Sequence, residues 1–323
     1  MLAYFNQASA LFHIPSLGQQ VDVMITHLEI QKSAKFDSHD GLRDKLLDSF
    51  CDYSNLKNPL DDEKDPRHWD IGILVTGLDM WTQNNGIKNF HTLGVARTKG
   101  MCHSKFSCAV VEFGVVGAIG TFYPTTGFSA AYTLAHEIGH TLGMFHDGED
   151  GCDRDGYIMS RSRGVHGQTK WSKCSERTLA SKRTEKKLKC LQDRPQKAPL
   201  WDHNSTNGVP GYFIPVEEQC KFYYKGKEGA SAANDPRDPT LCQHLQCTDG
   251  QKTESTGPPL EGTSCGGDGT HWCREGTCVP VQPAKWGGWQ EGLCQSACVA
   301  ESVGYRENTR QCLILQVNSS KNK

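Results

Sequence analysis

Several features are missing from this 323-residue chain, and each absence excludes a class of protein. The formal net charge is only −2, with 35 Lys and Arg residues against 37 Asp and Glu residues. Such a balance creates no overall field that would attract nucleic acid or an anionic membrane. The most apolar stretch, residues 113–122, is too short for a membrane span and is interrupted by glycine. We therefore expect neither a nucleic-acid partner nor a membrane span.

An export signal is also missing, since Met1 is followed directly by Leu2-Ala3-Tyr4-Phe5. The chain nevertheless has 15 cysteines, which is too many for a reducing compartment unless they bind metal. Their spacing lacks the paired C-x-x-C knuckles of structural zinc sites. Disulfide bonds in a secreted, extracellular protein are the better interpretation, and the glycosylation sequons at Asn204 and Asn318 agree with it. A disulfide-rich chain without an export signal suggests a fragment.

The most informative segment that is present, residues 136–147, spells H-E-x-x-H-x-x-G-x-x-H-D. On a helix, His136 and His140 lie one turn apart and face the same way, so both imidazoles can reach one cation. Gly143 can adopt the left-handed conformation that ends a helix, and the following turn brings His146 round as a third ligand. The complete pattern should occur by chance in roughly one such sequence in ten thousand. The segment predicts a zinc site.

Three protein ligands leave one coordination position open, and an open zinc site is catalytic. Zinc lowers the pKa of bound water to about 7, and the neighbouring carboxylate of Glu137 can take the proton. Downstream, Met159 supplies the methionine that the Met-turn of metzincins requires, although by itself it would more often fill a core. An apolar stripe should bury the same helix against the core; it consists of Ala131, Leu134, Ala135, Ile138 and Leu142.

Residues 1–195 alternate strand-like and helix-like segments, which is an α/β order. Val21, Val23 and Ile25 alternate as in a strand that continues to about Ile30. Further on, the pattern predicts a helical face at Leu42, Leu46, Leu47 and Phe50, a buried strand over 70–76, the zinc-site helix, and a last helix from near Ser175 to Lys189.

The composition changes near residue 196, where Gly, Pro, Asp and Cys become frequent. Residues 196–280 suit a small domain held by disulfides. A second break near residue 281 precedes a Trp-x-x-Trp and a Cys-x-x-x-Cys pattern. The cysteines divide 6, 6 and 3 among the three segments 1–195, 196–280 and 281–323.

Together these motifs resemble the disintegrin-like metalloproteinases with thrombospondin motifs (ADAMTS). Three features carry the resemblance: the zinc motif at 136–147, the cysteine module from Gly262 to Val279, and the Trp286-to-Cys298 opening of a thrombospondin type 1 repeat. The chain has no Arg-Gly-Asp, so integrin binding by that route is not expected.

The resemblance implies an α/β zincin-type metalloprotease domain over 1–195, with a mixed sheet, an active-site helix and no first strand. A disintegrin-like, disulfide-rich domain over 196–280 and a partial thrombospondin repeat over 281–323 would follow. It implies that His136, His140 and His146 bind zinc, that Glu137 is the general base of peptide hydrolysis, and that Asp147 orients the turn after the third ligand.

The resemblance also implies a structural calcium ion, held by Asp70, the Cys190 carbonyl and Asp193, although two surface aspartates are the alternative. By the same resemblance the expected disulfides are Cys51–Cys108, Cys102–Cys190, Cys152–Cys174, Cys220–Cys247, Cys242–Cys273 and Cys265–Cys278.

Two functions are compatible with these motifs. The first is a secreted zinc metalloendopeptidase of extracellular or matrix proteins, whose later segments bind substrate or matrix. The second is a matrix-binding protein with a vestigial protease domain, which the intact His136, Glu137, His140 and His146 argue against.

Overall fold

The computed structural model describes residues 1–58, 65, 67–115, 126–148, 151–162, 167–184, 188–192 and 209–281, together with the backbone of 285–286, 290–295, 305–309 and 312–313. The chain divides into two compact units, Met1–Val279 and Pro280–Lys323. In the described part of the chain, no helix is long and apolar enough to cross a membrane.

A three-stranded mixed sheet forms the centre of the first unit. Strand β1 (Gly72–Thr76) pairs in parallel with β5 (Cys108–Glu112), and β4 (Gly94–Ala96) pairs antiparallel with the other side of β5. The order β1-β5-β4 therefore leaves β1 and β4 at the two edges among the described strands.

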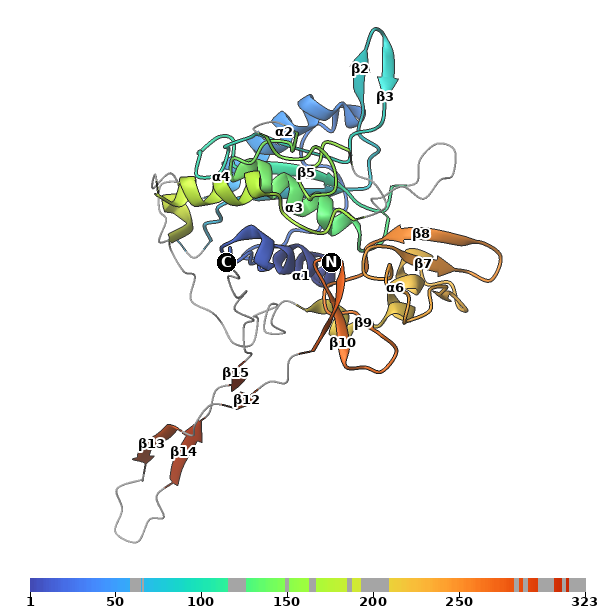
Figure 1. The fold of residues 1–323 in the computed structure, drawn as a ribbon. Helices are drawn as coiled ribbons and strands as arrows, with labels where there is room; N and C mark the ends of the chain where they lie inside the picture. Colours follow the sequence, from blue (N-terminus) through green and yellow to red (C-terminus); the bar gives the residue numbers. More distant parts are fainter. Residues whose placement is uncertain are drawn as a thin grey trace. The chain divides into compact units, whose positions relative to one another are not determined.

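Helices cover both faces of this sheet. Side chains of a strand point alternately to the two faces, so neighbouring residues of β5 contact different helices. Cys108 and Val110 of β5 pack with helix α2 (Arg43–Lys57) on one face. Val111 packs on the opposite face with α1 (Leu2–Leu11) and α3 (Ala130–Thr141). Figure 1 shows α1 beside α3, with α2 on the other side of the sheet. The result is a three-layer α/β/α arrangement.

Helix α3 is almost completely buried, as the apolar stripe predicted. The five stripe residues are each 2% exposed or less: Ala131, Leu134, Ala135, Ile138 and Leu142. Full burial of a leucine or isoleucine side chain, such as Leu134 or Ile138, stabilises the fold by roughly 1.5–3 kcal/mol before entropy costs. The zinc motif is thus carried by an element that the core holds firmly.

Several other predicted elements are present. Helix α2 covers the predicted helical face, and β1 lies within the predicted buried strand at 70–76. The last predicted helix corresponds to α4 (Lys173–Thr184), followed by a short 3-10 helix at Lys189–Gln192. A hairpin of β2 (Thr82–Asn84) and β3 (Ile87–Asn89) joins β1 to β4. Further 3-10 helices lie at Pro15–Leu17 and His39–Gly41.

The strand predicted from Val21 to about Ile30 is wrong, because these residues form no strand. Val21 and Val23 are partly buried against the core, as their alternation indicated. Ile30, by contrast, is 83% exposed. Alternation indicates which side chains face a core, whereas a strand also needs a neighbouring strand to pair with. Strand β1 pairs with β5 on one side only among the described strands, so nothing pairs with residues 21–30.

Helix α1 was not predicted. It starts at Met1 without a side-chain cap, so its sequence carries no start signal. Tyr4, Ala8 and Leu11 are fully buried against the core that α3 shares. The side-chain oxygen of Gln7 accepts a hydrogen bond of 2.9 Å from the backbone N–H of Glu261. Helix α1 therefore joins the protease domain to the cysteine-rich segment.

The described residues of the cysteine-rich segment, 209–280, form two short helices and two small sheets. The helices are α5 (Pro210–Phe213) and α6 (Val216–Tyr223). One sheet consists of β6 (Ser231–Ala232), β7 (Leu245–Thr248) and β8 (Thr253–Gly257); the other consists of β9 (Ser264–Cys265), β10 (His271–Arg274) and β11 (Thr277–Pro280). Its core consists largely of half-cystines and tyrosines.

All six expected disulfide pairs are bonded in the structure. Three lie in the protease domain, at Cys51–Cys108, Cys102–Cys190 and Cys152–Cys174. Three lie in the cysteine-rich segment, at Cys220–Cys247, Cys242–Cys273 and Cys265–Cys278. Each bond links residues of its own segment, so the two sets are independent.

The second unit contains two described antiparallel strand pairs. Strand β13 (Gln290–Gln295) pairs with β14 (Tyr305–Thr309), and β12 (Lys285–Trp286) pairs with β15 (Cys312–Leu313). The predicted partial thrombospondin repeat over 281–323 depends on its tryptophan and cysteine side chains, and these lie outside the described residues.

Candidate active site

Three histidines meet at the end of helix α3. The ligand atoms of His136, His140 and His146 all lie within 4.8 Å of one another. The Nε2 atoms of His140 and His146 are 3.3 Å apart. Two nitrogens bound at about 2.0–2.1 Å to one tetrahedral zinc ion would be separated by about 3.3 Å, so this spacing fits zinc. The donor set therefore fits a single zinc ion.

The outer ring nitrogens of both helical histidines are bound by backbone carbonyls. The Nδ1 atom of His136 is 2.6 Å from the Ile158 carbonyl oxygen, and that of His140 is 2.8 Å from the Met144 oxygen. A carbonyl can only accept, so each Nδ1 carries the proton and each Nε2 keeps its lone pair for a metal.

Burial also favours neutral imidazoles. It lowers the pKa of His140 to about 4, with a smaller lowering from neighbouring His146. Burial likewise lowers the pKa of His146. Only a neutral imidazole can donate a lone pair to a metal, so burial favours the form of both groups that can act as a ligand.

The third ligand is delivered by the turn that Gly143 makes. Gly143 has a φ of +102°, a conformation that side chains rarely adopt. Its N–H donates to the His140 carbonyl at 2.9 Å, which closes the helix end. The N–H of Asp147 then donates to the Met159 carbonyl at 2.9 Å. The chain carrying His146 is thus fixed at both ends.

Glu137 is the buried acid of the site. Its side chain is only 4% exposed, and burial raises its pKa to about 8. The carboxyl thus lies in a water-poor environment beside the three histidines, which is where the sequence places it. Its Oε2 atom has no hydrogen-bond partner in the described part of the chain. On one side it faces the first residue of β4, because a Cβ added to Gly94 would lie 2.6 Å from Oε1.

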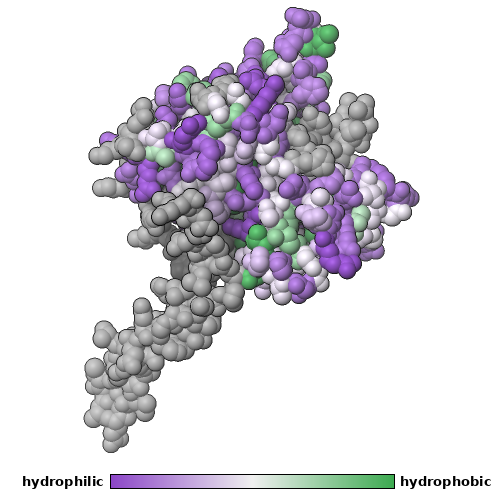
Figure 2. All heavy atoms as spheres, viewed as in Figure 1, coloured by the Kyte–Doolittle hydropathy of each residue, from purple (hydrophilic) through white to green (hydrophobic). Residues whose placement is uncertain are grey.

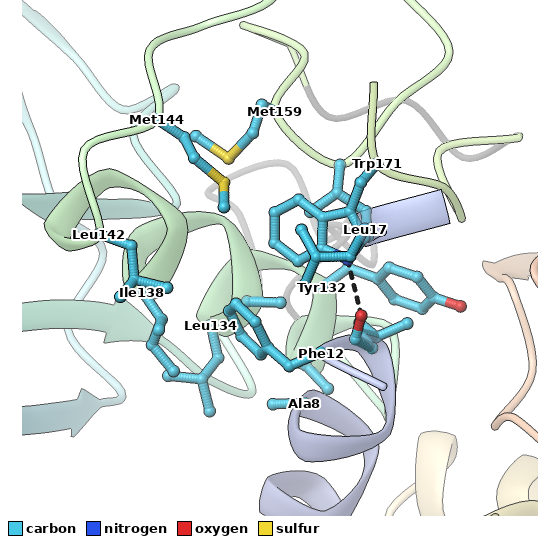
Figure 3. Packing of buried hydrophobic residues seen from close by; sticks show 14 of the residues in the cluster. Ala8, Phe12, Leu17, Tyr132, Leu134, Ile138, Leu142, Met144, Met159 and Trp171 are labelled. Carbon is cyan, nitrogen blue, oxygen red and sulfur yellow. Dashed lines mark hydrogen bonds between the residues drawn. The ribbon is translucent and has the colours of Figure 1, made fainter. Parts of the chain in front are cut away.

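Met159 lies completely buried beneath the zinc-site helix, next to Met144 and Trp171 (Figure 3). A Cβ added to Gly139 would lie only 2.8 Å from the Met159 sulfur, so the glycine lets the methionine approach the helix closely. The indole N–H of Trp171 donates to the Leu11 carbonyl at 2.6 Å, drawn as a dashed line in Figure 3. The segment that carries Met159 also contacts the zinc motif through its backbone, because the Ile158 carbonyl binds His136 and the Met159 carbonyl binds Asp147.

The predicted calcium ligands are only partly described. Asp70 has a buried Oδ1 atom, and Cys190 is bonded to Cys102, whereas Asp193 lies outside the described residues. Within the described ranges, Asp70 belongs to no group of three His, Cys, Asp or Glu ligand atoms. Calcium stays a prediction. The sequons at Asn204 and Asn318 also lie outside the described residues.

Sequence reasoning missed two glycines that shape the site. Gly94 borders Glu137 from the sheet, and Gly139 borders Met159 from the helix. Neither has a positive φ, so no turn signal marks them. A glycine inside a strand is itself a sign of close approach, and this signal could have pointed to Gly94.

Comparison with known protein families gives two matches. Residues 21–195 match the reprolysin (M12B) family of zinc metalloproteases. Residues 210–279 match the ADAMTS cysteine-rich domain 2. The first match contains the whole zinc site, and the second contains both small sheets of the cysteine-rich segment.

Curated relatives align with nearly the whole chain. "A disintegrin and metalloproteinase with thrombospondin motifs 7" of Rattus norvegicus is 32% identical over 332 residues, covering 97% of this chain and 19% of the relative. "A disintegrin and metalloproteinase with thrombospondin motifs 16" of Homo sapiens is 33% identical, and the match covers 97% of this chain and 24% of that protein. The adt-1 protein of Caenorhabditis elegans is 30% identical, covering 97% and 22%. The chain therefore spans about a fifth of the length of these relatives.

Proposed function

The chain belongs to the reprolysin (M12B) zinc metalloproteases and shares the cysteine-rich domain of the ADAMTS proteins, and on that premise we propose that it is a secreted zinc endopeptidase of extracellular or matrix proteins. The observation that carries the proposal is the site itself. The ligand atoms of three histidines converge, and one buried carboxyl lies beside them. This combination is suited to hydrolysis by activated water.

In the proposed reaction, His136, His140 and His146 hold one zinc ion. When bound, zinc polarises the scissile carbonyl and acidifies water. Glu137 accepts the proton that the attacking water loses and then hands it to the leaving amine. Its position on α3 next to His136, and its burial, support both steps, because the carboxyl lies beside the site where the water would be activated. No further cofactor is needed for the chemistry.

The edge strand β4 offers a way to bind an extended substrate. The N–H of Glu112 donates to the Leu93 carbonyl at 2.9 Å. In an antiparallel pair every second residue directs its backbone N–H and C=O groups to the partner strand, so those of Leu93 and Val95 point toward β5. The backbone N–H and C=O groups of Gly94 and Ala96 consequently point away from the sheet. We propose that an extended peptide pairs with them and so lies alongside Glu137.

Secretion is supported by the six disulfides, which persist only in an oxidising compartment. Among the coloured residues in Figure 2, hydrophilic side chains predominate and apolar ones form small areas. Residues 196–280 and the partial thrombospondin repeat at 281–323 would bind substrate or matrix. Glycans at Asn204 and Asn318, and a calcium ion at Asp70, Cys190 and Asp193, complete the proposal.

Incubating the full chain, loaded with zinc, with a peptide library tests the function. We expect internal cleavage, detected by mass spectrometry, that a zinc chelator abolishes and added zinc restores. Absence of cleavage of every peptide by protein with one bound zinc would contradict the proposal.

A further inference from the structure

We propose that Gly94 is a positioning residue of the peptidase site: because it has no side chain, the Glu137 carboxyl can lie against the edge strand β4. The inference rests on the proposed peptidase activity and adds to it a residue that lies outside the zinc motif at 136–147.

The evidence is the space beside Gly94. A Cβ added there would lie 2.6 Å from Oε1, 2.7 Å from Cγ and 2.9 Å from Cδ of Glu137. Real Cβ atoms essentially never approach other heavy atoms below 3.0 Å. These three nearest atoms all belong to one side chain, so Glu137 is the first group that a larger residue at position 94 would meet.

The backbone does not require glycine at this position. The φ of Gly94 lies outside the left-handed region. The residue is paired in register with Val111 as part of β4. Gly94 is the first residue of β4, and glycine loses more conformational freedom on folding than any other residue, so the backbone gains nothing from glycine here. The glycine therefore serves the close approach of Glu137 rather than the geometry of the strand.

Packing is the main constraint on the Glu137 carboxyl. Its Oε2 atom is buried and has no hydrogen-bond partner among the described residues. Its side chain is 4% exposed, so its rotamer is chosen by its surroundings. The strand β4 is one of these, and a methyl group at position 94 would force the carboxyl into a different place.

The displaced group is the end of a side chain, not backbone. Gly94→Ala should therefore leave the fold intact and move only the base. A displacement near 1 Å at a reacting group lowers turnover by about 100-fold. The structure thus predicts a variant that folds, binds zinc and works poorly.

The experiment measures kcat, KM and bound zinc for the full chain with Gly94→Ala, using one peptide substrate of the wild type. We expect kcat to fall about 100-fold, with one zinc retained and KM little changed. Gly77→Ala is the matched control, since nothing lies within 4 Å of its added Cβ. The control should keep wild-type activity. Wild-type kcat in Gly94→Ala would overturn the proposal.

A second background separates positioning from a direct block of the substrate. Glu137→Ala removes the Cγ, Cδ and Oε1 atoms that lie nearest to the added Cβ and so frees the space beside position 94, and its residual turnover is the reference for this comparison. In that background Gly94→Ala should change kcat by less than about twofold. An equal loss in both backgrounds would mean that the methyl group acts on the substrate, and the proposal would be wrong.

Crystal structures of zinc-loaded wild type and Gly94→Ala give a readout that does not depend on activity. We expect the Glu137 carboxyl to shift away from β4 while the three histidines superimpose. Superimposable carboxyls would overturn the positioning role. If the wild type cleaves no peptide, the proposed function fails, and the two crystal structures still decide the role of Gly94.

Discussion

Replacing Gly139 with alanine should change the free energy of unfolding in two opposite ways, by raising helix propensity and by overpacking the core. Gly139 lies inside α3 and has no positive φ, so alanine alone should stabilise the helix by about 1 kcal/mol. The added Cβ, however, would lie 2.8 Å from the Met159 sulfur and 3.3 Å from both the Met144 sulfur and Trp171. Overpacking of this kind costs about 1–3 kcal/mol. The net loss of stability is therefore about 0–2 kcal/mol, and we expect a value of about 1 kcal/mol.

Thermal unfolding of the zinc-loaded protein, followed by circular dichroism, measures the outcome. A loss of about 1 kcal/mol should lower the melting temperature of Gly139→Ala by about 2–4 °C. In a Met159→Ala background the closest contact is absent, so the same substitution should be neutral or stabilising. A higher melting temperature for Gly139→Ala in the otherwise wild-type chain would refute the packing argument.

Two further predictions concern stability. Burial raises the pKa of Glu261 from 4.5 to about 7, so the folded chain binds its proton more tightly than the unfolded chain, and stability falls as pH rises from about 4.5 to 7. Glu261→Gln should flatten this fall in melting temperature, and an equally steep profile would contradict it. Removing the disulfide Cys51–Cys108, with a separation of 57 residues, should cost about 4 kcal/mol, against about 3 kcal/mol for Cys152–Cys174, with a separation of 22. Denaturant unfolding of the double-alanine variants measures both, and the opposite ranking would show that strain or packing outweighs chain entropy.

The zinc site was predictable because its information is local. Residues one helical turn apart share a face, so His136 and His140 converge wherever the segment forms a helix. Gly143 indicates the turn that brings in His146, and its φ of +102° is a conformation that favours glycine, as predicted for this turn. The elements α2 and β1 followed from apolar spacing for the same reason.

Features that depend on distant neighbours were not predictable. Strand pairing is one, and the residues from Val21 to Ile30 were wrongly predicted because alternation does not reveal a missing partner. The role of a strand glycine is a second such feature. The side chain that lies against Gly94 belongs to Glu137, which is far along the chain. The six disulfides were expected from family resemblance, because six cysteines in one segment allow 15 pairings and spacing cannot select among them.

The most direct test of the central claim compares Glu137→Ala with the wild type, both purified with one bound zinc. Glu137 is not a ligand, so the zinc content should be unchanged, whereas loss of the proton acceptor should reduce peptide turnover by about 10²–10⁴-fold. Glu228→Ala, which changes an exposed glutamate of the cysteine-rich segment, serves as the control and should keep full activity. Comparable turnover in Glu137→Ala and wild type would contradict the mechanism.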